Sequence, residues 1–238
     1  MVLPKGMDQP VFDKLRLQAR LQIESKGKAR PEYRPVNNPD DSVPLGLRCL
    51  PEASKGDIYF DLEAYPLFEP DGLVYLFGAM IMTHGKAQQK AWWAHSQSEE
   101  KLAFSTFIDW VTQRRKTYKD LHVYHYGAFE PSNMLRLSLL HSAKEAEVTT
   151  LIREGVFVDL YRIVRQALII GEPGYSIKNV EKLYGETRSG DVTSAGDSII
   201  GYACYCETGN EKYLREIRKY NIVDCESTKG LADWLREL

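Results

Sequence analysis

Three consecutive stretches in the first half of the chain have the apolar content and alternation of β-strands. They are DIYFDLEAY, GLVYLFGAMIM and KAQQKAWWAH, and the turn sequences EPDG and THGK lie between them. An apolar period of two is typical of half-buried strands, and short turns favour hairpins. The pattern therefore predicts three hairpin-linked antiparallel strands between residues 56 and 95.

After residue 95 the apolar spacing becomes mainly helical. Ser96 and Glu99 have the spacing of a capping box. An apolar face of Phe104, Phe107, Ile108 and Val111 follows. LHVYHY predicts a buried strand, and further helices are expected from Pro131, in DLYRIVRQALII, in SIKNVEKLYG and at the C-terminus.

The order of these elements predicts an α/β fold. A three-stranded antiparallel start followed by alternating helices and strands implies a mixed sheet flanked by helices. The ribonuclease H-like arrangement has this order. Residues 1–55, with a charged helix and a Pro-, Asn- and Asp-rich connector, are interpreted as a lead-in, and residues 56–238 as one domain.

Composition favours a globular chain that stays in the cytoplasm. The 238 residues are 43% hydrophobic, enough for a sizeable core. The longest apolar run, Leu73 to Met82, is about half of the ~20 residues that span a membrane, and the N-terminus has no apolar signal core. Four cysteines without a CxxC pair and five scattered histidines do not indicate zinc or a disulfide framework.

Two acids share one face of the first predicted strand. The period of two places Asp61 and Glu63 opposite Ile58, Phe60 and Leu62. Neighbouring carboxylates on a central strand repel each other and favour a bound cation. An exposed face of an edge strand is the alternative.

Two further acids lie near predicted helices. Glu130 precedes Pro131 and is expected just outside the helix, where the helix dipole alone would favour an acid. Asp224 lies on the inward stripe of the last helix with Tyr220 four residues earlier, although a surface acid bonded to that tyrosine is an alternative. Taken together, the four acids match the requirements of a two-metal phosphoryl-transfer site.

These residues resemble the motifs of the DEDD, or DnaQ-like, exonuclease superfamily. Its Asp-x-Glu motif is matched by Asp61 and Glu63 in FDLEAY, and its Tyr-x-x-x-Asp motif by Tyr220 and Asp224 in YNIVD. The histidine subclass would have His where this chain has Lys219, so the tyrosine subclass fits. The second motif of the superfamily usually ends in Asp, whereas HYGAFEP offers Glu130.

A closer resemblance runs from about Gly56 to the C-terminus. GDIYFDLEAYP, HVYHYGAFEP, VDLYRIVRQAL and YNIVDCEST are similar to the ribonuclease H-like domain of bacterial predicted RecB-type nucleases. This resemblance implies that the chain is a module of a DNA-processing protein. It also implies helicase or RecB-like nuclease modules as partners.

The leading hypothesis is a 3′–5′ exonuclease acting on single-stranded or 3′-ended DNA. Asp61, Glu63, Glu130 and Asp224 would hold two Mg²⁺ or Mn²⁺ ions, and Tyr220 would orient the attacking water. A catalytically idle nucleic-acid-binding or scaffolding domain and a structure-selective endonuclease are the alternatives.

A basic rim that holds the phosphate backbone is expected beside the acidic centre. Arg162 and Arg165 lie on the polar side of their predicted helix, and Lys178 opens the next one. A net charge of −2 does not exclude such a rim, because local basic residues can accompany an acidic metal centre. A solvated helix face is the alternative.

Overall fold

The structure is a computed structural model that describes residues 6–36, 43–185 and 194–238. The chain divides into two compact units. Unit 1 consists of the described residues of Met1–Leu50, Leu160–Thr187 and Gly230–Leu238. Unit 2 consists of those of Pro51–Asp159 and Arg188–Lys229.

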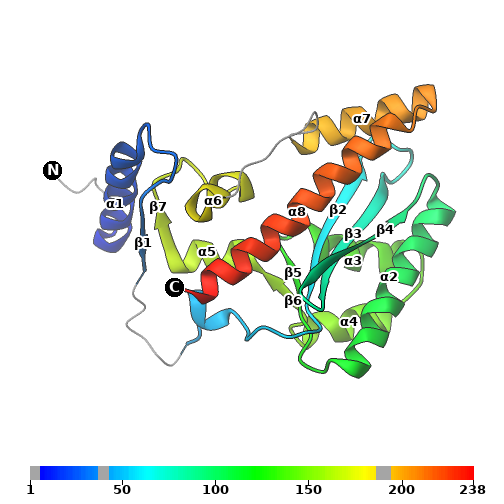
Figure 1. Ribbon diagram of the computed structural model, residues 1–238, viewed down its shortest axis with the longest axis horizontal. Coiled ribbons are helices and arrows are strands. Elements are labelled where there is room, and N and C mark those ends of the chain that lie inside the picture. Colours follow the sequence, from blue (N-terminus) through cyan, green and yellow to red (C-terminus); the bar gives the residue numbers. More distant parts are fainter. Residues whose placement is uncertain (1–5, 37–42, 186–193) are drawn as a thin grey trace. The chain divides into compact units, whose positions relative to one another are not determined.

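A five-stranded mixed sheet forms the centre of unit 2, with strand order β4-β3-β2-β5-β6 (Figure 1). The strands are β2 (Ile58–Tyr65), β3 (Leu73–Thr83), β4 (Lys86–Trp93), β5 (Val123–His125) and β6 (Phe157–Asp159). Strands β2, β3 and β4 are antiparallel neighbours, whereas β5 and β6 continue the sheet in parallel. The predicted ribonuclease H-like α/β order is confirmed.

Helices cover both faces of this sheet. On one face, apolar side chains of β2 and β3 share a core with three helices, α2 (Gln97–Thr117), α3 (Phe129–Leu140) and α4 (Glu145–Arg153). On the other face, Tyr75 of β3 packs with residues of α7 (Ala195–Thr208) and α8 (Lys212–Arg236). The part of α8 from Gly230 onward belongs to unit 1.

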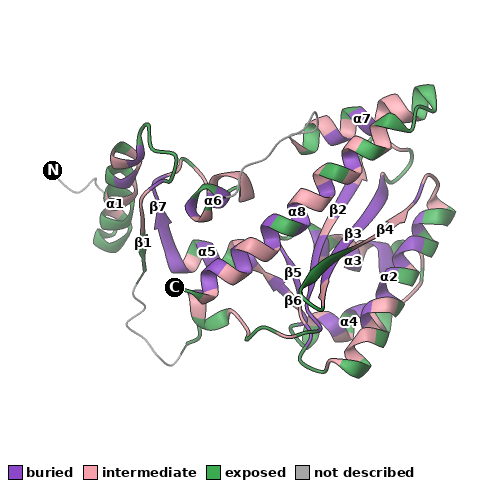
Figure 2. Cartoon of the chain, viewed as in Figure 1, coloured by how far each residue is buried: buried purple, intermediate pink, exposed green. Residues whose placement is uncertain are grey.

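The alternation along β2 separates its apolar and acidic side chains as predicted. Phe60 stacks on Phe107 of α2, with ring centroids 4.2 Å apart. Asp61 and Glu63 point to the opposite face, where they meet α8 and α7. Strand β2 is central and buried, whereas β4 is the exposed edge (Figure 2). The edge-strand explanation of the acids is therefore wrong.

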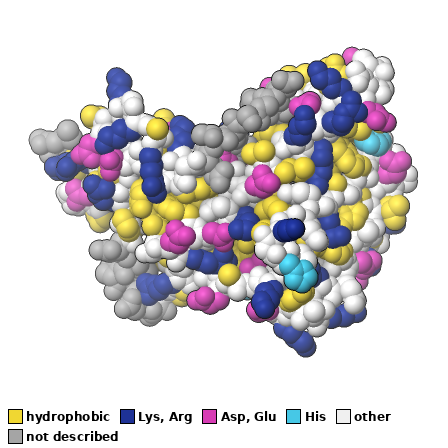
Figure 3. All heavy atoms as spheres, in the orientation of Figure 1, with side chains coloured by type: hydrophobic (Ala, Val, Ile, Leu, Met, Phe, Trp, Pro, Cys, Tyr) yellow, Lys and Arg dark blue, Asp and Glu magenta, His cyan; other side chains and the backbone are white. Residues whose placement is uncertain are grey.

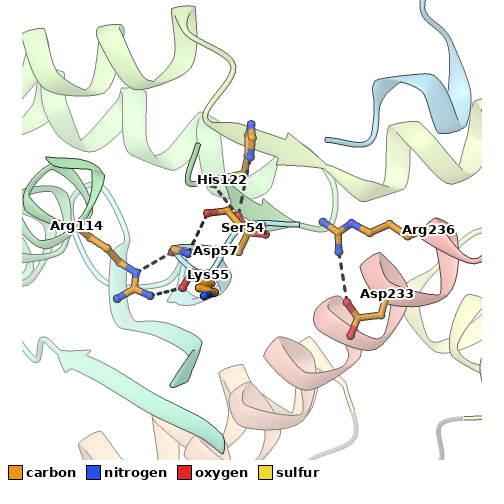
Figure 4. A network of polar contacts seen from close by, with 8 residues as sticks. Ser54, Lys55, Asp57, Arg114, His122, Asp233 and Arg236 are labelled. Atoms are coloured by element: carbon orange, nitrogen blue, oxygen red, sulfur yellow. Dashed lines mark hydrogen bonds and ion pairs between the residues drawn. The ribbon is translucent and has the colours of Figure 1, made fainter. Parts of the chain in front are cut away.

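A separate acid, Asp57, anchors the start of β2 (Figure 4). Its carboxylate accepts hydrogen bonds from the backbone N–H groups of Ser54 at 2.9 Å and His122 at 3.0 Å. Arg114 of α2 donates to the carbonyl oxygens of Gly56 and Lys55 at 2.7 and 3.1 Å. These bonds join the entries of β2 and β5 to the end of α2, which fixes the position of the acids further along β2.

One helix start and one capping hydrogen bond differ from the predicted ones. Helix α3 begins at Phe129, so Glu130 lies in its first turn rather than before it. Proline is tolerated at position 131 because the first N–H groups of a helix have no partner within the helix. At α2, Ser96 Oγ accepts from Glu99 N at 3.3 Å as expected, but Glu99 Oε2 accepts from His95 N at 2.6 Å rather than from Ser96.

Unit 1 combines the start of the chain with later segments. It contains α1 (Gln9–Ser25), β1 (Tyr33–Pro35), the 3₁₀ helix η1 (Gly46–Cys49), α5 (Leu160–Ala167), β7 (Leu168–Ile170) and α6 (Ile177–Tyr184). DLYRIVRQALII is thus a helix followed by a strand, because its last residues pair with β1. The described residues before residue 51 pack within this unit, and the boundary at residue 56 stays a prediction.

No helix in the described ranges has the length and apolar character needed to cross a membrane. All four cysteines are free in the structure.

Candidate metal centre

Three of the predicted acids converge in unit 2. Each of Asp61, Glu63 and Asp224 offers a carboxylate oxygen, and these oxygens lie within 4.8 Å of one another. Asp61 and Glu63 project from one face of β2, and α8 crosses that face and carries Asp224. Glu63 and Asp224 are buried, and Asp61 is half-buried. The prediction that these distant positions converge in space is confirmed for these three acids.

Glu130 lies outside this group of three but acts on it electrostatically. Its charge contributes to raising the pKa of both Asp61 and Glu63. Glu130 is buried, and its Oε2 lies 3.5 Å from Nδ1 of the buried His125. Burial raises the pKa of Glu130 above its usual range, and His125 partly offsets this effect.

Tyr220 stands one helical turn before Asp224 on α8, as the sequence predicts, and is partly exposed. This spacing places both side chains toward one side of the helix. Its role toward a water molecule stays a prediction.

The clustered acids are costly to ionise. Burial raises the pKa of Asp61 well above its usual range, and the charges of Asp224, Glu63 and Glu130 raise it further. Burial also raises the pKa of Glu63 to about 8, against the lowering effect of a hydrogen bond from Ser198. Burial and mutual repulsion both disfavour the carboxylate form in the absence of a cation.

Membership of a known family follows from comparison with other proteins. A family model described as the RNase H superfamily matches residues 58–236. The chain belongs to the RNase H superfamily. The matched region contains the whole five-stranded sheet and all four predicted acids. Neither curated proteins nor solved structures give a match.

The acidic group of this RNase H superfamily chain fits a hard divalent cation. Carboxylate oxygens are the ligands that Mg²⁺ and Mn²⁺ prefer. Glu63 Oε1 is buried and has no hydrogen-bond partner among the described residues, which is unfavourable unless a cation meets it. Asp61, Glu63 and Asp224 could therefore hold a metal ion.

Side chains from α7 and α8 donate hydrogen bonds to the two acids of β2, Asp61 and Glu63. Ser198 of α7 donates to Glu63 Oε2 at 2.6 Å, and the Tyr75 hydroxyl lies 2.5 Å from Ser198 Oγ. Asn221 of α8 donates through Nδ2 to Asp61 Oδ2 at 2.8 Å and to the Asp61 carbonyl at 3.2 Å. Ser198 and Asn221 are both buried, so these polar contacts are shielded from water.

Sequence reasoning missed these contacts, although one signal was present. An isolated glycine inside a strand often marks the close approach of another segment. Gly78 is such a residue in the apolar β3, directly opposite Asp61 in the strand pairing. A Cβ atom at Gly78 would overlap the amide group of Asn221.

A basic and aromatic cavity of about 520 Å³ lies elsewhere in unit 2. Its lining residues are Trp93, His95, Glu211, Leu214, Arg215, Arg218 and Lys219. The space-filling view shows lysine and arginine side chains gathered toward the α7 and α8 end of the molecule (Figure 3). Cations beside aromatic rings are typical of surfaces that bind single-stranded nucleic acid.

The residues of the predicted basic rim lie in unit 1. Arg162 and Arg165 are exposed on α5, and Lys178 is half-buried in α6. Arg165 packs over the ring of Tyr175, with its Cζ 5.0 Å from the centroid, and donates to the Tyr161 hydroxyl at 3.4 Å. Their role in phosphate binding stays a prediction.

Metal-free protein should lose stability as the pH rises. The folded-state pKa of Glu63, about 8, lies above its usual value of 4.5. The contribution of Glu63 to the free energy of unfolding is therefore complete below its unfolded-state pKa of 4.5. It is lost as the pH rises through its folded-state pKa of about 8. We expect the melting temperature in chelator to fall between about pH 5 and about pH 8.5, and to fall less in Glu63→Gln. Identical pH profiles for the two proteins would contradict this assignment.

Proposed function

We propose that the protein is a metal-dependent nuclease, specifically a 3′–5′ DNA exonuclease of the DEDD type with a tyrosine motif. The observation that carries this proposal is the convergence of Asp61, Glu63 and Asp224 in an RNase H superfamily chain. Membership of this superfamily implies a nucleic-acid ligand and suggests phosphodiester hydrolysis. The finer assignment rests on the Asp-x-Glu and Tyr-x-x-x-Asp spacings.

Each residue has a proposed role. Asp61, Glu63 and Asp224 hold Mg²⁺ or Mn²⁺, and Glu130 completes the ligand set of a second ion from the first turn of α3. Bound cations of this kind stabilise charge on the attacking and leaving oxygens. Tyr220 accepts or donates a hydrogen bond to position the water that attacks the terminal phosphodiester. The partners proposed from the family resemblance are helicase or RecB-like nuclease modules.

A nucleic-acid-binding domain without turnover is the second candidate. It is favoured by Glu130, which does not join the compact group of three acids and has a longer side chain than the usual aspartate. In that case the acids would bind a metal that holds the phosphate backbone without cleaving it.

Cleavage of two matched DNA substrates tests the proposal. The purified chain is incubated with 5′-labelled linear single-stranded DNA and with a circular single strand of similar composition, each with Mn²⁺ or with EDTA. We expect a ladder of shortening 5′-labelled products in Mn²⁺ only, and intact circles. The Asp61→Asn variant serves as the control for contaminating nucleases.

The other outcomes each favour a different function. Cleavage of the circular DNA would indicate an endonuclease rather than an exonuclease. DNA binding without any cleavage would favour the idle domain. Equal cleavage by the wild type and Asp61→Asn would show that the activity comes from another protein.

The proposed basic rim predicts a change in the salt dependence of DNA binding. Arg165→Ala should weaken binding equally for all sequences, because phosphate contacts carry no sequence information. The slope of log affinity against log salt should become shallower by about one unit for the lost contact. The measurement is a series of binding isotherms across salt concentrations, with EDTA present to prevent cleavage.

Arg16 provides the matched control, because it is an exposed arginine of unit 1 that lies on α1. Arg16→Ala should leave both affinity and slope close to those of the wild type. If Arg165→Ala behaves like Arg16→Ala, Arg165 belongs to a solvated helix face.

A further inference from the structure

Two polar side chains each hold one carboxylate oxygen of the β2 acids, Asp61 and Glu63. Ser198 comes from α7 and Asn221 from α8, so each bond joins the sheet to a different helix. Glu63 is held through Oε2, and its Oε1 is buried without a partner among the described residues. The hydrogen bonds therefore occupy one carboxylate oxygen and leave the other available.

The contacts around Ser198 fix the direction of its hydrogen bond. A serine hydroxyl has a single proton but can also accept. Because Ser198 donates to Glu63 at 2.6 Å, the Tyr75 hydroxyl at 2.5 Å acts as the donor to Ser198. Tyr75 is itself fixed, since its ring stacks on Tyr202 with centroids 3.8 Å apart. This chain of contacts restricts the rotamer of Ser198 and, through it, the carboxylate of Glu63.

The amide of Asn221 is oriented in the same way. Arg218 donates through Nη1 to Asn221 Oδ1 at 2.9 Å, and through Nη2 to the Lys90 carbonyl at 3.1 Å. Arginine can only donate and an ionised carboxylate can only accept. Only one orientation of the Asn221 amide satisfies both Arg218 and Asp61, so its Nδ2 faces Asp61.

We propose that Ser198 and Asn221 are positioning residues that hold the carboxylates of Glu63 and Asp61 in a metal-binding geometry before the cation arrives. This inference rests on the proposed function for its catalytic meaning, but metal binding alone can test it. Groups that hydrogen-bond to metal ligands restrict their orientation, and their loss typically weakens metal affinity by about 10- to 100-fold. Where the acids are ionised, holding them also limits the movement away from one another that their repulsion would otherwise favour.

Mn²⁺ titration by calorimetry, without nucleic acid, tests the role of Ser198. Ser198→Ala should raise the Mn²⁺ dissociation constant by about 10-fold or more, and Ser198→Thr, which keeps the hydroxyl, should restore most of the affinity. Ser138→Ala is the matched control, because it removes another buried serine hydroxyl of unit 2, one that donates to the Leu135 carbonyl of α3 at 2.8 Å. It should lower the melting temperature comparably but bind Mn²⁺ nearly as the wild type does.

A parallel pair of variants tests Asn221. Asn221→Ala should also weaken Mn²⁺ binding by about 10-fold or more. Thr228→Val removes another buried polar group of α8, whose hydroxyl donates to the Asp224 carbonyl at 2.8 Å, and should lower stability without a comparable loss of affinity. In cleavage assays the positioning variants should require more Mn²⁺ for half-maximal rate, with a smaller change in the rate at saturating Mn²⁺.

These results separate the inference from the proposed function. Wild-type Mn²⁺ affinity in folded Ser198→Ala and Asn221→Ala would overturn the positioning roles even if the wild type is an active nuclease. If both variants bind Mn²⁺ more weakly and the wild type cleaves no DNA, the positioning roles are supported and the proposed nuclease activity is contradicted.

Discussion

Asp224→Asn should abolish metal-dependent cleavage, with a loss of more than about 100-fold in rate at any Mn²⁺ concentration. Asp224 is the α8 contribution to the group of three acids, and its oxygen lies within 4.8 Å of those from β2. Replacing one carboxylate oxygen by an amide nitrogen removes both a ligand and a negative charge. The cleavage assay with labelled linear DNA measures this loss directly.

The same substitution should stabilise the metal-free fold. The charge of Asp224 raises the pKa of both Asp61 and Glu63, so its removal relieves repulsion among buried groups. We therefore expect a higher melting temperature for Asp224→Asn than for the wild type in EDTA at pH 8, and the reverse order in saturating Mn²⁺. The exposed Glu226 lies on the same helix, and Glu226→Gln is the matched control with neither effect. Full activity of Asp224→Asn would show that Asp224 is not a metal ligand needed for cleavage.

The predicted fold followed from local patterns that match the architecture. Strands β2, β3 and β4 are linked by short turns and have eight to eleven residues, so their pattern is long enough to be recognised. Strands β1 and β7 have three residues each and pair across more than a hundred positions. Nothing local distinguishes such a strand from a helix end or a connector, because its conformation depends on its distant partner.

The acids of the site could be predicted from the sequence because charged side chains occupy positions whose pattern predicts burial. A carboxylate on the inward stripe of a helix, such as Asp224, or on a central strand, such as Asp61, is unfavourable without a partner. Serine and asparagine give no comparable signal, because neutral polar residues occur in helices for many reasons. Ser198 and Asn221 acquire their significance only from the three-dimensional contacts with the acids.

A single methyl group at Gly78 should disrupt the metal centre. The Cβ atom of Gly78→Ala would overlap the Asn221 amide, which is buried and held by Arg218 and Asp61. Relief requires the amide to move away from Asp61 or α8 to move away from the sheet. We expect a destabilisation of about 1–3 kcal/mol from overpacking and a Mn²⁺ affinity lower by about 10-fold or more. Chemical denaturation and calorimetric titration measure the two effects separately.

Two further variants distinguish overlap at this site from a general effect of alanine. Gly201 is buried on α7, and a Cβ there would meet Ile217 at 3.6 Å, an ordinary contact, so Gly201→Ala should leave stability and Mn²⁺ affinity nearly unchanged or slightly improved. In the double variant Gly78→Ala/Asn221→Ala the overlapping amide is absent, so much of the stability should return. Mn²⁺ affinity should stay low, because Asp61 still lacks the donor that orients it. Recovery of both stability and Mn²⁺ affinity in the double variant would show that Gly78 acts through packing alone and that Asp61 does not need Asn221.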